Sequence, residues 1–182
     1  LPLPCPCRAI PQALSSKAGA QRMELAFIVF KLVHLLSIII WVGGMFFAHM
    51  FLRPAVQSLA PPERVRLMHD VLQRFFSAVL IIVVLTLFSG LGMMGAMHSM
   101  AARFGGRFDL PISWIVMSVL GIAMMAVFGH IRFALFKRLQ RAVAGQDWPA
   151  GGKALASIRH WVALNLALGL VIVLVLRLPS LF

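Results

Sequence analysis

Acidic residues are scarce in this sequence, and their scarcity limits the functions that it can carry. The 182 residues include 5 Asp and Glu against 17 Lys and Arg, and none of the five carboxylates lies deep in a hydrophobic run. A proton-coupled transporter usually needs a carboxylate buried in the membrane to carry the proton, so this class is disfavoured. The hydrophobic segments also lack a Ser-His-Asp set, a phosphate-binding loop and a carboxylate pair.

Cysteine is confined to Cys5 and Cys7, within the first 22 residues. This stretch does not begin with Met, is broken by prolines and lacks the apolar core of a signal peptide. We expect the native protein to start at Met23, with residues 1–22 a disordered or non-native upstream extension. That start would leave no cysteine and would exclude disulfides and thiol chemistry. The alternative is a native extension whose Cys-Pro-Cys unit binds a metal.

Hydrophobic residues are abundant. They make up 61% of the sequence, and the mean hydropathy of +0.94 is typical of a polytopic membrane protein. Four segments are long and apolar enough to cross a bilayer, at about residues 24–52, 72–98, 111–136 and 158–178. Arg53–Pro54 is expected to end the first span. The predicted fold class is all-α: an integral membrane antiparallel four-helix bundle, with residues 23–182 as a single domain.

The basic residues predict an orientation. Four spans place both termini on one side of the membrane. Ten Lys and Arg lie in the loops that follow spans one and three, against four from Met23 onward on the other side. The positive-inside rule therefore places both termini in the periplasm of a bacterial-type inner (plasma) membrane. Because these cations meet lipid headgroups, we expect the lipid bilayer as a partner and no nucleic acid.

The first span carries a polar pattern. His34 and Trp41 are two turns apart and share one face of a helix, and Gly43–Gly44 thins the helix just beyond them. Ionisable groups at membrane depth usually point into a bundle or a cavity. We therefore expect the other three spans to cover this face.

Methionines near the outer end of the second span predict a copper site. Met93 with Met97, and Met94 with His98, are pairs four residues apart on a helix. Thioethers are soft ligands that select Cu(I), and imidazole also binds copper. Together with His34, these side chains form the predicted metal site. The competing interpretation is that the methionines fill gaps beside glycines in an apolar helix.

Haem b is the alternative cofactor. His49, His130 and His160 lie toward the cytoplasmic ends of their spans, and neutral imidazole is a good ligand for haem iron. His49 with His130, or His130 with His160, would supply two axial ligands, and His34 is the candidate for an outer site. The competing interpretation of His49 and His160 is a position at the level of the headgroups.

The first span resembles the first helix of the copper-resistance protein D (CopD) family. The resemblance rests on HLLSIIIWVGGMFF, from His34 to Phe47, on the Leu52–Ala55 continuation, and on the four-span layout of the small single-domain members. It implies an inner-membrane protein in copper handling or uptake. His34 is the position that matches the family's first-helix histidine.

Lys31-x-x-His34 followed by Trp41 is also similar, more distantly, to the HemJ-type protoporphyrinogen oxidases. That resemblance implies haem b bound through the first-helix histidine, and a lysine in the third helix. Residues 114–131 contain no lysine, so the oxidase activity lacks this support, while haem binding stays open. Any enzymatic activity would then be that of a haem-dependent membrane oxidoreductase. A further alternative is a cofactor-free accessory subunit of a larger membrane complex, and a homodimer is equally open.

Overall fold

The computed structural model describes residues 9–103, 105 and 110–177, and Cys5, Cys7 and the predicted last residue of span four, Leu178, lie outside them. The described elements are α1 (Ala9–Phe47), η2 (Ala48–Leu52), α2 (Arg53–Ala55), η3 (Val56–Ser58), α3 (Pro61–Arg103), α4 (Ile112–His130), η4 (Ile131–Leu135), α5 (Phe136–Ala144) and α6 (Trp148–Arg177). No strand occurs in this part of the chain, which confirms the all-α prediction.

Four helical stretches among the described residues are long and apolar enough to cross a membrane. They are Gly19–Ser58, Pro61–Arg103, Ile112–Ala144 and Trp148–Val175. Each contains or overlaps one of the predicted spans, and each extends beyond the apolar core that hydropathy detects. The four-span prediction is therefore confirmed, and the helices are longer than the hydrophobic runs that revealed them.

Helical geometry continues past Pro54, where the sequence predicted an end. Proline lacks an N–H, and its ring clashes with the carbonyl four residues earlier in an α-helix. Ahead of it, η2 is a π-helix in which the Arg53 N–H bonds to the Ala48 carbonyl, five residues back. This wider turn accommodates the proline, and the helical conformation ends at Ser58.

The chain folds into two units. Unit 1 is formed by Leu1–Leu36 and Leu85–Asp109, and unit 2 by Ser37–Val84 and Leu110–Phe182. The helices α1 and α3 therefore each contribute one part to each unit.

Unit 1 is a pair of antiparallel helices. His34 of α1 lies against Gly90 of α3, and Phe30, one turn earlier in α1, lies against Gly92, further along α3. A Cβ placed on Gly92 would stand 2.8 Å from three atoms of the Phe30 ring, so the lack of a side chain lets the two helices approach.

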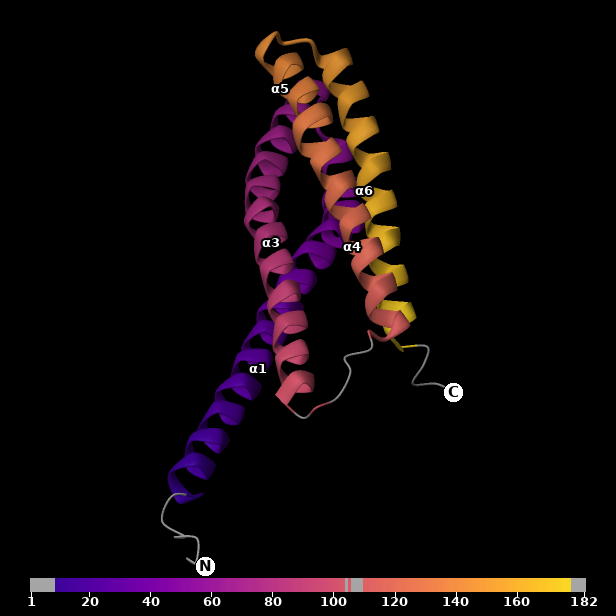
Figure 1. Cartoon of the computed structure of the whole chain (residues 1–182). Helices are drawn as coiled ribbons and strands as arrows, with labels where there is room; N and C mark the ends of the chain where they lie inside the picture. The colour runs from indigo at the N-terminus through magenta and orange to yellow at the C-terminus, as the bar shows by residue number, and fades with distance from the viewer. Residues whose placement is uncertain (1–8, 104, 106–109, 178–182) are drawn as a thin grey trace, which may run out of the picture. The chain divides into compact units, whose positions relative to one another are not determined.

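Unit 2 is a four-helix bundle built from parts of α1 and α3, from α4 with its continuation α5, and from α6. Figure 1 shows α4 and α6 running side by side. Aromatic rings join three of these helices: Trp41 meets Phe128 edge-on with centroids 6.0 Å apart, and Phe76 meets Phe136 at 5.4 Å. All four side chains are at least 95% buried, so they form the centre of the bundle.

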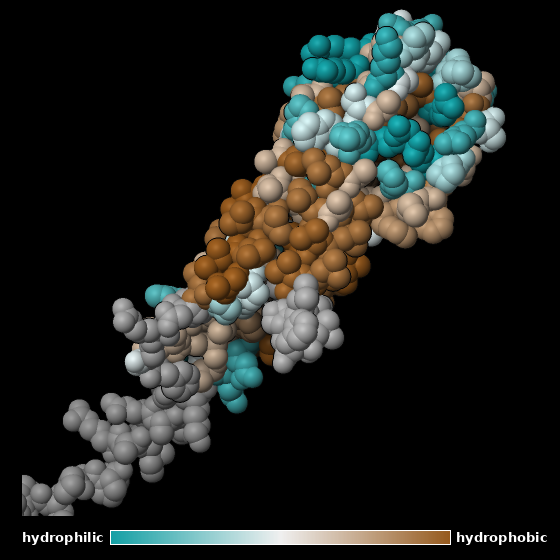
Figure 2. Space-filling view, turned by 90° about the vertical axis from the view of Figure 1, so that its right-hand side faces the viewer, coloured by the Kyte–Doolittle hydropathy of each residue, from teal (hydrophilic) through white to brown (hydrophobic). Residues whose placement is uncertain are grey.

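Both units expose large apolar side chains. In unit 1 Phe88 is 67% exposed, and in unit 2 Ile122 is 64% exposed. Hydrophilic side chains instead gather at the end of unit 2 that carries the turn between α5 and α6, as Figure 2 shows. Extended apolar surface of this kind is unfavourable in water and favourable in lipid, so the exposed faces suit contact with the bilayer.

Candidate functional site

The imidazole of His34 is held by α3 through one of its two nitrogens. Nδ1 lies 3.0 Å from the carbonyl oxygen of Thr86 and 3.1 Å from the hydroxyl oxygen of Ser89. The Ser89 hydroxyl donates its own proton to the Leu85 carbonyl at 2.6 Å. A carbonyl only accepts, so Nδ1 carries a proton and donates it, and in the neutral imidazole Nε2 carries the lone pair.

This hydrogen bonding is typical of a histidine that is preorganised to bind a metal. Metal-ligating histidines usually donate the N–H of the second ring nitrogen to a carbonyl or carboxylate, which fixes the tautomer and the ring plane. The ring is half-buried, and a Cβ on Gly90 would lie 3.4 Å from its Cε1 atom. His34 therefore has a fixed ring whose Nε2 is chemically able to act as a ligand.

Met93 lies on the face of α3 that His34 contacts. Thr86, Ser89 and Met93 are spaced three and four residues apart, which places them on one side of a helix. All three are buried, with exposed fractions of 8%, 2% and 8%. Met93 is therefore a buried thioether one turn beyond Ser89 on α3.

The other members of the predicted copper site are more open. Met94 and Met97 are half-buried, and His98 is exposed, near the end of α3 in unit 1. Met97 follows Met93 by one turn and continues its face of the helix. The five predicted ligands therefore all belong to unit 1, and the four on α3 become more exposed from Met93 to His98.

Of the histidines proposed as haem ligands, His34 lies in unit 1 and the other three lie in unit 2. His130 and His160 are exposed, and the His130 ring lies beside Trp161 with centroids 4.8 Å apart. His49 is half-buried in η2. No group of three or more His, Cys, Asp or Glu that could hold a metal ion is found within residues 9–103, 105 and 110–177. The pairing of these histidines around haem stays a prediction.

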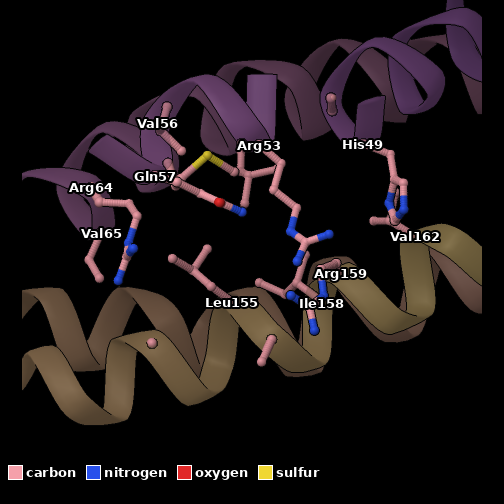
Figure 3. Close-up of a pocket in the computed structure, with 15 residues that line it drawn as sticks. His49, Arg53, Val56, Gln57, Arg64, Val65, Leu155, Ile158, Arg159 and Val162 are labelled. Atoms are coloured by element: carbon pink, nitrogen blue, oxygen red, sulfur yellow. The ribbon is translucent and has the colours of Figure 1, made fainter. Parts of the chain in front are cut away.

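Unit 2 also contains a cavity of about 420 Å³ that the sequence did not predict (Figure 3). Its polar lining consists of Arg53, Arg64 and Arg159 with His49 and Gln57. Each of these cations alone is typical of a headgroup anchor near a helix end, so no signal in the sequence pointed to a shared site.

The profile of the family described as Copper resistance protein D matches residues 69–178, more than half of the chain. The chain belongs to this family. No curated protein and no solved structure matches it. Membership of the copper resistance protein D family, together with the four apolar helices, makes the chain a copper-resistance-related, multi-pass membrane protein.

The matched region and the resemblance noted in the first span cover different candidate ligands. It starts at His69, so it contains the whole cluster from Met93 to His98 but does not reach His34. The predicted family is confirmed on helices other than the one that suggested it. The similarity of the first span to HemJ-type oxidases stays a prediction.

Proposed function

We propose that this copper resistance protein D relative handles or takes up copper, with Cu(I) as its cargo bound between α1 and α3 of unit 1. The observation that supports the proposal most is the hydrogen bond from His34 Nδ1 to the Thr86 carbonyl at 3.0 Å. It leaves Nε2 as the nitrogen with a lone pair, beside the face of α3 that carries the buried Met93.

The imidazole and thioether groups of the proposed site suit Cu(I). Imidazole and thioether are neutral ligands, and the thioether is soft, a combination that favours Cu(I) over divalent hard cations. His34 and Met93 would form the inner part of the site, and Met97 would extend it by one turn. Met94 and His98, which are more open, would receive copper at the end of α3. Ser89 would act by orienting His34 rather than by touching the ion.

The orientation is part of the proposal. We place the protein in a bacterial-type inner membrane with both termini and His98 toward the periplasm, because the more strongly basic loops follow spans one and three. In that orientation the exposed end of the methionine cluster faces the side from which copper arrives.

Competition with a chromophoric Cu(I) chelator tests the proposal on the full chain in detergent under anaerobic conditions. Wild type should withdraw Cu(I) from the chelator, and His34→Gln and Met93→Leu should each weaken its affinity at least tenfold. Met50→Leu is the matched control, because Met50 is 55% exposed and lies in unit 2. Equal affinity in all four proteins, with circular dichroism showing intact helices, would rule the site out.

A further inference from the structure

Arginines from three separate segments line the cavity in unit 2. Arg53 comes from α2, Arg64 from the start of α3 and Arg159 from α6. The volume of about 420 Å³ lies within the range of small-ligand sites. The charged side chains therefore surround a space that is large enough to hold a polar group of a ligand.

Negative charge is missing from the lining. All fifteen lining residues are apolar, neutral or basic. Within the described part of the chain, no ion pair joins a carboxylate to any of the three guanidinium groups. Asp70 instead pairs with the imidazole of His69 at 3.0 Å, and Asp147 accepts the Ala150 N–H at the start of α6. The positive charge of the cavity is thus not balanced by these acidic side chains.

Two of the arginines face each other. Figure 3 shows the guanidinium groups of Arg53 and Arg159 extending toward one another from opposite walls. Like charges in this arrangement repel, and an anion between them would turn the repulsion into two attractions. His49, one turn before Arg53, and Gln57, one turn after it, add two further polar side chains to the same wall.

Two arginines outside the cavity show a different arrangement. The guanidinium of Arg66 lies 4.9 Å from the centroid of the Trp148 ring, and that of Arg132 lies 5.4 Å from the Phe136 centroid. A cation over an aromatic face is already stabilised. Arg66 and Arg132 are thus stabilised by aromatic rings, whereas the three cavity arginines line a space that contains no acidic side chain.

We propose that the cavity binds a phosphate group, supplied either by the headgroup of an anionic phospholipid or by a soluble phosphate. Guanidinium groups bind phosphate oxygens in pairs of parallel hydrogen bonds, and several around one cavity favour a phosphate over a single carboxylate. The apolar part of the lining, which includes Val56, Leu155 and Val162, suits the carbon chain of a phospholipid. None of the residues proposed to bind copper takes part.

Native mass spectrometry of the full chain tests the lipid source. The protein is reconstituted with equal parts of phosphatidylglycerol and phosphatidylcholine and released into the gas phase. Wild type should retain phosphatidylglycerol preferentially, and Arg53→Gln and Arg159→Gln should each reduce this retention about tenfold, the loss of one charge-assisted contact. Arg66→Gln is the matched control and should behave as wild type, and Arg159→Lys should fall between.

Inorganic phosphate, titrated into the protein in a neutral detergent, tests the soluble source by the shift in thermal unfolding. Retention of phosphatidylglycerol that depends on Arg53 and Arg159 supports the site with the lipid as its ligand. A phosphate-dependent shift that these variants lose supports the site with a soluble ligand. The proposal is overturned when wild type shows neither effect, or when Arg66→Gln loses as much as Arg159→Gln.

Discussion

His34 donates its Nδ1 proton to the carbonyl oxygen of Thr86, across the interface between α1 and α3 of unit 1. The distance of 3.0 Å is ordinary for an N–H···O bond, and the sequence separation of 52 makes it a tertiary contact. Its consequence is chemical, because it decides which ring nitrogen keeps a lone pair.

Replacement of Ser89 tests the role of this hydrogen-bond set. The Ser89 hydroxyl oxygen lies 3.1 Å from His34 Nδ1, so Ser89→Ala removes one acceptor and loosens the ring without removing a ligand. We expect Cu(I) affinity to fall about tenfold in the chelator competition while the fold is kept. Ser99→Ala is the control, since its hydroxyl bonds the Gly95 carbonyl of its own helix. An unchanged affinity in Ser89→Ala would show that the ring needs no such support.

Adjacent glycines at the start of α6 provide a matched test of packing. A Cβ on Gly151 would lie 2.8 Å from Cγ1 of Val65, which is 2% exposed and has no room to move, whereas a Cβ on Gly152 meets nothing within 4 Å. Gly151→Ala should lower the free energy of unfolding by about 1–3 kcal/mol. Gly152→Ala should leave it unchanged or raise it slightly. Thermal unfolding in detergent measures both, and equal midpoints would contradict the close contact between α3 and α6.

The buried amide of Asn165 gives a third prediction. Its Nδ2 donates to the sulfur of Met45 at 3.5 Å, and its Oδ1 has no hydrogen-bond partner among the described residues. Asn165→Leu removes an unsatisfied buried acceptor and should raise the free energy of unfolding by about 1 kcal/mol. Asn165→Asp brings a charge into the same place and should lower it. Destabilisation by Asn165→Leu would indicate that Oδ1 has a partner in the membrane, such as a bound water.

The proposed orientation is tested with single cysteines in a chain whose Cys5 and Cys7 are replaced by serine. Ser58→Cys and Ala144→Cys lie on exposed positions of unit 2 that we place in the cytoplasm, and Ala102→Cys on an exposed position of unit 1 that we place in the periplasm. A membrane-impermeant maleimide applied to intact cells should label Ala102→Cys alone. Labelling of the first two instead would reverse the orientation.

The fold was largely predictable because the bilayer imposes a simple rule. A span needs about 20 apolar residues, so hydropathy alone located four spans. The ends of the helices were less predictable, since α3 begins at Pro61 and α5 ends at Ala144 in sequence that is amphipathic or charged. The passage through Pro54 depends on a π-helix, and no local pattern predicted it.

The candidate sites were predictable only where a single residue was unusual for its surroundings. His34 stood out as an imidazole in an apolar run. Its partners, the Thr86 carbonyl and the Ser89 hydroxyl, did not, because which polar group meets it depends on how two distant helices are rotated. The cavity arginines were missed for the same reason, since Arg53 and Arg159 are remote in sequence and only the packing of α6 places them together.

Copper binding through unit 1 can be measured on one detergent-purified sample of the full chain, divided between elemental analysis and an optical spectrum. We expect stoichiometric copper that His34→Gln and Met93→Leu fail to retain, and no haem absorbance. Iron in place of copper, with a Soret band that shifts on reduction with dithionite, would contradict this expectation and would direct attention to His49, His130 and His160 as haem ligands.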